Sequence, residues 1–222
     1  MVLLGQSAEA HGSEVAAGPS ATAMIRGFFQ GTEMPDADWW HTLFANPAHV
    51  LTVAGLIPGV SAVDLCAGDG WFTLPMARIA SRVVAVDIDP ALLDRARTLL
   101  SDAGLTNCAF RIADAFDLPK QIAGPVDFVF LANAFHGVPD QTKLSCIVAT
   151  VLAPAGRFAI VNWHRRPREE TTVLGQPRGP GSELRMSPEM VNAVVEPSGL
   201  KLLYVTDVPP YHYASVFEKV SP

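Results

Sequence analysis

The sequence Val63-Asp64-Leu65-Cys66-Ala67-Gly68-Asp69-Gly70-Trp71-Phe72-Thr73 decides the fold, and Val83-Val84-Ala85-Val86-Asp87 follows shortly after it. Each stretch begins as a short apolar run, which indicates a buried strand. The first run ends in a glycine-rich turn and the second in Asp87, so we expect a strand, a turn, a helix and a second strand. The turn glycines allow the backbone to approach a ligand at the mouth of a parallel sheet, where Asp64 and Asp87 place carboxylates. The stretch therefore predicts a crevice for a nucleoside with an ammonium tail.

The composition indicates one compact domain. The chain has 222 residues, 49% of them hydrophobic, which suffices for a sizeable core. Its net charge of −6 argues against a protein that grips nucleic acid through a broad basic face, so we expect no nucleic-acid partner. The cysteines Cys66, Cys108 and Cys146 lie far apart without metal-ligand spacing, which fits free thiols in a reducing cytoplasm.

Residues 1–22 have neither a basic leader nor an apolar run long enough for a membrane span. We expect a disordered tail there, with no membrane anchor and a cytoplasmic location.

Beyond this tail the sequence alternates helix and strand signals. The most clearly marked helix begins with Asp89 as cap and Pro90 in the first turn and ends before Gly104. Only Pro209-Pro210 separates the last two strands, so they must be antiparallel, whereas helical crossovers join parallel neighbours. Strands are expected at 63–65, 83–87, 107–112, 126–132, 158–163, 200–208 and 211–220, and helices at 36–44, 47–56, from Thr73, at 90–103, at 139–152 and from Ser187 to Pro197.

Together, the glycine turn, the acid after the second strand and the closing hairpin resemble the class I S-adenosylmethionine-dependent methyltransferases of the small-molecule type. The resemblance covers roughly residues 35 to 220 and includes the turn Leu152-Ala153-Pro154-Ala155-Gly156-Arg157-Phe158. It implies an α/β fold, a Rossmann-like three-layer sandwich whose seven-stranded sheet is mostly parallel and ends in an antiparallel C-terminal hairpin. Residues 23–222 would form a single methyltransferase domain with a helical cap at about 35–57.

The resemblance also implies S-adenosylmethionine as cofactor and assigns its binding residues. Asp64 and the backbone around Cys66 would hold the methionine portion, Asp87 the ribose hydroxyls, and Asp114 with the amide of Ala115 the adenine. One residue departs from the family pattern, because Cys66 stands where the first glycine of the turn is usual. The implied cofactor residues are Asp64, Cys66, Ala67, Gly68, Gly70, Asp87, Ile88, Asp114, Ala115 and Asn133.

Two other interpretations of the turn stay open. The glycines and aspartates could serve an ordinary strand-turn-helix unit through packing and capping. The turn could also bind a nicotinamide dinucleotide, although Thr73 stands where that fingerprint has its third glycine.

The acceptor side of the crevice is expected where later strands end. His136, His164 and His212 follow or begin such strands, and a histidine is the best-matched base near neutral pH when an acceptor must lose a proton. We take these three as candidate catalytic residues, with His136 nearest the transferred methyl group. Each could instead cap a loop or pack on an aromatic ring, and the three together could bind a metal, although no supporting acid is visible and we expect none.

Substrate contacts are expected from the same edge and from the arginine-rich loop after 158–163. Guanidinium groups match carboxylates and phosphates, which favours an anionic acceptor, although the loop could equally be solvated and paired with its own glutamates. The candidate substrate residues are Phe135, Trp163, Arg168, Arg178 and Tyr211.

The sequence thus predicts an enzyme that transfers a methyl group from S-adenosylmethionine to a small polar or anionic molecule, at oxygen, nitrogen or sulfur. The alternatives are a non-catalytic S-adenosylmethionine-binding partner protein and a protein methyltransferase. The oligomeric state is not readable from the sequence.

Overall fold

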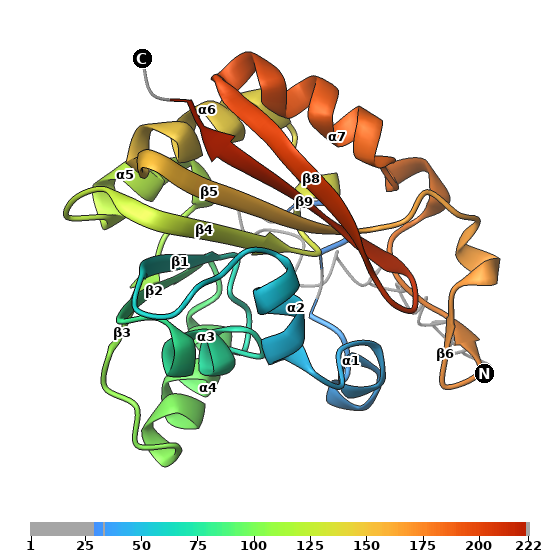
Figure 1. Cartoon of the computed structure of the whole chain (residues 1–222). Coiled ribbons are helices and arrows are strands. Elements are labelled where there is room, and N and C mark those ends of the chain that lie inside the picture. The colour runs from blue at the N-terminus through green and yellow to red at the C-terminus, as the bar shows by residue number, and fades with distance from the viewer. Residues whose placement is uncertain (1–28, 33, 221–222) are drawn as a thin grey trace, which may run out of the picture.

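The computed structural model describes residues 29–32 and 34–220, and its main feature is a seven-stranded sheet with the order β3-β2-β1-β4-β5-β9-β8 (Figure 1). Strands β1 to β5 pair in parallel, whereas β9 runs antiparallel to both β5 and β8. The strands are β1 (Ser61–Leu65), β2 (Arg82–Asp87), β3 (Cys108–Ile112), β4 (Val126–Ala132), β5 (Leu152–Trp163), β8 (Leu200–Val208) and β9 (His212–Lys219). This order and the reversed last pair confirm the predicted Rossmann-like sheet.

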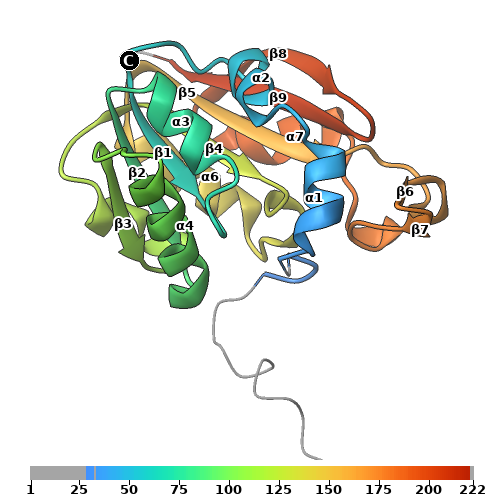
Figure 2. The same ribbon diagram turned by 90° about the horizontal axis from the view of Figure 1, so that it is seen from below.

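Helices cover both faces of the sheet, which gives the three-layer arrangement seen in Figures 1 and 2. On one face α2 packs on α3, and α3 on α4, while on the other α6 packs against both α5 and α7. The helices are α1 (Ala37–Leu43), α2 (Pro47–Val53), α3 (Thr73–Ile79), α4 (Pro90–Asp102), α5 (Leu118–Gln121), α6 (Gln141–Val151) and α7 (Pro188–Val195). Within the described residues, none of these helices is long and apolar enough to cross a membrane.

The central strands are apolar on both sides because helices cover both sides. Val63 and Leu65 of β1 belong to the core beneath α6 and α7, whereas Ala62 of the same strand belongs to the core beneath α2 and α3. Asp64 alternates with them and is the buried polar residue of this strand. Its position in the middle of an apolar sheet makes it a functional candidate rather than a surface charge.

Helix α4 begins as its sequence signals predict. The Asp89 side chain accepts hydrogen bonds from the backbone N–H groups of Ala91 and Leu92, and Pro90 occupies the first turn. Such a cap contributes about 1 kcal/mol and fixes where the chain leaves β2. The end of β2, which carries Asp87, is therefore held in place by the start of the next helix.

The structure departs from the predicted elements in several places, among them the unpredicted helix α5. Strand β5 begins at Leu152 rather than at 158, because the turn expected there continues the β4 pairing through an irregularity between Val126 and Phe128. The arginine-rich loop contains a small hairpin, β6 (Thr172–Val173) and β7 (Gln176–Pro177), that no periodic pattern predicted. The predicted tail at 1–22 lies outside the described residues, and the division into a tail and a single domain stays a prediction.

Candidate functional site

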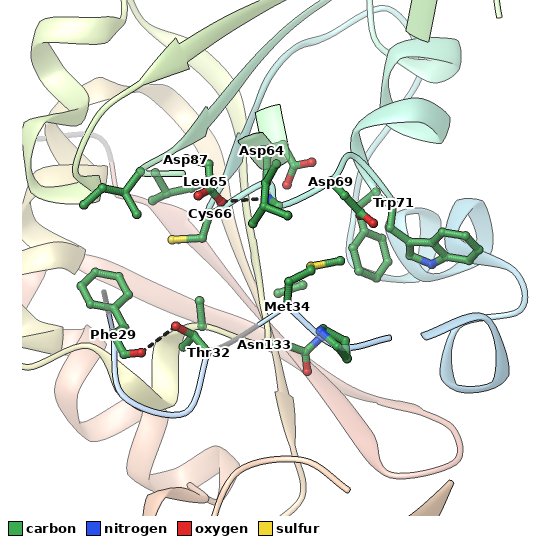
Figure 3. Close-up of a pocket in the computed structure, with 18 of the residues that line it drawn as sticks. Phe29, Thr32, Met34, Asp64, Leu65, Cys66, Asp69, Trp71, Asp87 and Asn133 are labelled. Atoms are coloured by element: carbon green, nitrogen blue, oxygen red, sulfur yellow. Dashed lines mark hydrogen bonds between the residues drawn. The ribbon is translucent and has the colours of Figure 1, made fainter. Parts of the chain in front are cut away.

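A cavity lies at the carboxyl ends of β1 to β5, where ligands bind in open parallel sheets. The space in the cavity and in its open mouth together is about 1070 Å³. Figure 3 shows its residues from the strand ends facing a segment that precedes α1. The predicted site residues that line it are Asp64, Cys66, Ala67, Gly68, Asp87, Ile88, Asp114, Ala115, Asn133, His136 and Trp163.

Asp87 ties the glycine turn to the start of α4. One carboxylate oxygen accepts a hydrogen bond from the backbone N–H of Gly68 at 2.8 Å, and the other accepts one from Asp89 at 2.9 Å (Figure 3). Burial raises the pKa of Asp87, and the backbone hydrogen bonds oppose this shift. Each oxygen still has a lone pair, so the carboxylate can also accept two donors from a ligand.

Asp64 lies at the floor of the cavity and is only 3% exposed. The Thr73 hydroxyl donates to its carboxylate at 2.6 Å, and burial raises its pKa to about 7 against the effect of this hydrogen bond. The negative charge of Asp87 adds to the increase. Asp64 can therefore change its charge near neutral pH when a cation arrives.

The raised pKa of Asp64 predicts a specific pH dependence of stability. An unfolded Asp64 ionises near pH 3.8, whereas the folded one holds its proton to about pH 7, so its contribution to stability is complete below pH 3.8 and is lost as pH rises through 7. In Asp64→Asn that loss is absent. We expect the ligand-free variant to lose about 2–4 kcal/mol less stability than the parent protein between pH 4 and pH 8. Urea denaturation at both pH values measures this, and equal losses in the two proteins would refute it.

Cys66 adopts a left-handed backbone with φ of +60°, which the usual glycine would adopt without steric cost. Burial raises the pKa of its thiol, and the charges of Asp87, Asp64 and Asp114 raise it further. The thiol therefore stays protonated and forms a small neutral part of the wall.

Gly70, predicted to contact the cofactor, lies outside the cavity lining. A Cβ atom at Gly70 would lie 2.8 Å from the Cβ of Ala96, so this position lets α4 pack against the turn. Its role in the structure is close packing beneath the site.

Residues 29–32, Met34 and Pro35 lie along one side of the cavity, and we call them the roof. His136 Nε2 lies 3.1 Å from the Gly31 carbonyl oxygen, and a Cβ atom at Gly137 would lie 2.2 Å from the Gln30 carbonyl oxygen. Met34 lies over the glycine turn, with its sulfur 3.1 Å from the position of a Cβ atom at Gly68. Figure 3 shows Phe29, Thr32 and Met34 facing the strand ends. The absence of side chain at Gly137 thus allows the roof to pack directly on the loop after β4.

Residues 62–156 match the family model described as a methyltransferase domain. The match begins in β1 and ends in β5, so it contains the glycine turn, Asp87 and Asp114. This part of the chain is therefore similar to methyltransferase domains.

Individual relatives of this methyltransferase domain are more distant. An uncharacterised protein of Mycobacterium tuberculosis is 30% identical over 114 residues, which are 51% of this chain and 41% of the relative. The ubiquinone biosynthesis O-methyltransferase of Xanthomonas axonopodis pv. citri is 28% identical over 140 residues, which cover 58% of this chain and 57% of that enzyme. The chain thus spans about half the length of the curated relatives it matches.

Solved structures support the fold of the methyltransferase domain. A SAM-dependent methyltransferase from Aquifex aeolicus superposes with a TM-score of 0.67 at 23% identity, covering 79% of this chain and 90% of that one. At this identity the likeness concerns the fold, and acceptor chemistry does not follow from it.

The three candidate histidines occupy different surroundings. Burial lowers the pKa of His136, which lines the cavity. His164 contacts Asp207 at 3.2 Å and lies outside the lining, as does His212, which is buried between the rings of Phe44 and Trp163. Among residues 29–32 and 34–220, no three His, Cys, Asp or Glu side chains are grouped as a metal site.

The remaining predicted substrate residues also lie outside the cavity lining. Phe135 is fully buried in the core and packs on Phe158, and Tyr211 stacks behind Trp163 and donates its hydroxyl to the Thr172 carbonyl. Arg168 donates to the Gly179 carbonyl, and Arg178 lies over the ring of Trp39 at 5.8 Å. Tyr211, Arg168 and Arg178 thus contact residues that line the cavity, and Phe135 belongs to the core.

Sequence reasoning missed the residues that come from the roof, from α1 and from the glycine turn itself. The rows of aromatic residues near α1 and Trp71 were the available signal, but no motif relates them to the strand ends. The lining residues outside the predicted set are Phe29, Gly31, Thr32, Met34, Pro35, Trp39, Trp40, Leu65, Asp69, Trp71, Phe72, Val86, Leu92, Ala113, Ala132, Ala134, Gly179 and Pro180.

Proposed function

We propose that this protein is an S-adenosylmethionine-dependent methyltransferase that acts on a small molecule. The observation that carries the proposal is the convergence of Asp64, Gly68, Asp87 and Asp114 on one cavity at the carboxyl ends of β1, β2 and β3. This is where an open parallel sheet binds nucleotide-like ligands.

The residues of this half of the cavity fit the donor. Asp64 matches an ammonium group, Asp87 retains lone pairs for two ribose hydroxyls, and Asp114 lies beside Ala115 at the far end for the adenine. Both amide atoms of Asn133 and one carboxylate oxygen of Asp69 are buried and have no hydrogen-bond partner among the described residues. Such atoms in a cavity wall fit a polar ligand. S-adenosylmethionine, when bound, supplies a methyl group activated by attachment to a sulfonium.

The protein's part in methyl transfer is mainly orientation. The nucleophilic atom must lie in line with the methyl carbon and the leaving sulfur, and holding reactants in such geometry contributes about 7–11 kcal/mol in model reactions. Asn133, His136 and Trp163 at the ends of β4 and β5 would place the acceptor beside the donor half, and the roof lines the same cavity.

His136 is the proposed base for acceptors that must lose a proton. A carbonyl oxygen can only accept, so the 3.1 Å contact with Gly31 assigns the imidazole proton to Nε2 and leaves a lone pair on Nδ1. Nδ1 is buried without a hydrogen-bond partner among the described residues, and its ring is neutral at physiological pH because burial lowers its pKa. These features suit a proton acceptor.

Replacing His136 tests this role. We expect His136→Ala to lower turnover about 10²–10⁴-fold on an acceptor that must be deprotonated, with donor affinity unchanged. His136→Gln can still donate to the Gly31 carbonyl and hold the roof but cannot act as a base, so it should be equally slow. In the parent protein kcat/KM should fall on the acid side with an apparent pKa below 6.5, the ordinary value for histidine. Full turnover in His136→Gln would show that His136 positions the roof and does not act as a base.

The acceptor is less defined than the donor. An anionic acceptor, as the arginine loop suggested, has little support from the cavity, since Arg168 and Arg178 lie outside its lining. The Xanthomonas relative's name points to transfer to oxygen, and we include hydroxyl acceptors on that basis. A non-catalytic binding protein would have no need of the neutral His136 and the aromatic wall, and a recessed cavity favours a small molecule over a protein substrate.

A screen with S-adenosylmethionine labelled in its methyl group tests the proposal. Label should move to at least one small hydroxyl, amine or thiol compound, with a gain of one methylene in product mass. Cofactor binding without transfer to any compound in a broad screen would favour the non-catalytic alternative.

A further inference from the structure

All four tryptophans of the chain line the same cavity. Trp39 and Trp40 come from α1, Trp71 from the turn after β1, and Trp163 from the end of β5. An aromatic stripe on one helix commonly packs a core. The rings here come from three separate parts of the chain and meet at one cavity, which is stronger evidence for a ligand-binding wall. The inference drawn from them rests on the proposed function for the donor's place in the cavity.

The rings of Trp40 and Trp163 pack closely against neighbouring side chains. Trp40 packs edge-on against Trp39, Phe44 and Phe72 at ring distances of 5.9, 5.0 and 6.4 Å. Arg185 lies over the ring of Trp163 at 5.0 Å. A wall of fixed rings favours a flat, rigid ligand, since flat rings stack on it with little loss of conformational entropy.

Charge is confined to the donor half of the cavity. The lining carboxylates lie within or shortly after β1, β2 or β3, and they are Asp64, Asp69, Asp87 and Asp114. No Lys or Arg side chain belongs to the lining within the described part of the chain. An acceptor with a full charge would therefore lose hydration among these tryptophans without gaining a counter-ion.

Hydrogen-bonding groups are nevertheless present in the aromatic wall. The indole N–H groups of Trp40 and Trp71 are buried and have no acceptor among residues 29–32 and 34–220. A buried N–H without an acceptor is costly, so each fits a ligand oxygen or an ordered water. Figure 3 shows Trp71 beside Asp69 at one end of the cavity, across from Met34. The lining thus offers donors to an otherwise apolar ligand.

We infer that the methyl acceptor is an uncharged, planar aromatic compound that carries a hydroxyl or amine nucleophile together with an oxygen acceptor group. Its ring packs among Trp39, Trp40 and Trp163, and its nucleophilic atom lies toward Asn133 and His136.

Binding of aromatic compounds, each paired with its saturated counterpart, tests this inference on the whole chain. Catechol would be compared with cyclohexane-1,2-diol, and 2-methoxyphenol with 2-methoxycyclohexanol. In addition, 3,4-dihydroxybenzoate would represent an anionic acceptor and dopamine a cationic one. Tryptophan fluorescence is a direct readout, because every indole of the chain lines the cavity. With S-adenosylhomocysteine bound, we expect saturable changes with the neutral aromatic compounds and at least tenfold weaker binding of their saturated and charged counterparts.

Two variants of the half-buried Trp39 sharpen the test. Trp39→Leu should weaken binding of the neutral aromatic compounds at least tenfold, Trp39→Phe should largely retain it, and both should bind S-adenosylhomocysteine as the parent does. If saturated or charged compounds bind as tightly as the neutral aromatic ones, or if Trp39→Leu has no effect, the inference fails while donor binding stands. If S-adenosylhomocysteine does not bind, the proposed function fails separately. The comparison of aromatic with saturated compounds then still tests whether the cavity prefers aromatic ligands.

Discussion

Replacing Asp87 by alanine is expected to weaken S-adenosylmethionine binding at least about 100-fold. The carboxylate would lose its bonds to two ribose hydroxyls, and hydrogen bonds to a charged group contribute about 1.5–3 kcal/mol each. The change would also free the Gly68 amide, 2.8 Å from the carboxylate, and loosen the turn around the donor. Calorimetry with S-adenosylmethionine measures the loss.

Asp89→Ala is the matched control for Asp87→Ala. It removes a neighbouring carboxylate that caps α4 and lies outside the cavity lining. It should cost about 1 kcal/mol of stability. The backbone N–H of residue 89 still donates to Asp87, so donor affinity should stay close to that of the parent. Thermal denaturation of both variants separates lost binding from lost folding. A folded Asp87→Ala protein that binds the donor like the parent would contradict the assignment of Asp87.

Arg185→Met is expected to destabilise the protein by about 3–5 kcal/mol. Arg185 is 1% exposed, and its guanidinium donates to the carbonyls of Pro180, Arg166 and Arg178 and to the Thr171 hydroxyl. Methionine fills similar space but leaves these acceptors without their donor. The loop that carries Pro180 to the cavity should therefore loosen, and acceptor binding should weaken along with stability.

Urea denaturation measures the effect of Arg185→Met, with Arg165→Met as control. Arg165 lies in the same loop and is exposed, so its replacement should change stability by less than about 0.5 kcal/mol. Equal stabilities of the two variants would show that Arg185 does not hold the loop.

The parallel part of the fold was predictable because its signals are local. The apolar runs before Asp64 and Asp87 each mark a strand, and Asp89-Pro90 marks a helix start, so the strand ends could be brought together without coordinates. The rule that parallel strands present their carboxyl ends at one edge then placed Asp64, Asp87 and Asp114 in one crevice. The cavity lining contains all three.

The acceptor half was less predictable because it depends on contacts between distant segments. The roof reaches the loop after β4 through a contact of Gly31 with His136, 105 residues away in the sequence, and through a contact of Gln30 with Gly137. Arg185 illustrates the same limit. In sequence it belongs to a cationic loop that suggested anion binding, but in the structure backbone carbonyls surround its guanidinium. Charge patterns alone do not distinguish an arginine that binds a ligand from one that holds a loop.

The proposed function depends most directly on which nucleotide-like molecule the cavity binds. Calorimetric titration of the full-length protein with S-adenosylmethionine, and in parallel with NAD, tests this. We predict saturable binding of one S-adenosylmethionine per chain and no binding of NAD. Binding of NAD without binding of S-adenosylmethionine would contradict the proposed function and the placement of every donor contact described for Asp64, Asp87 and Asp114.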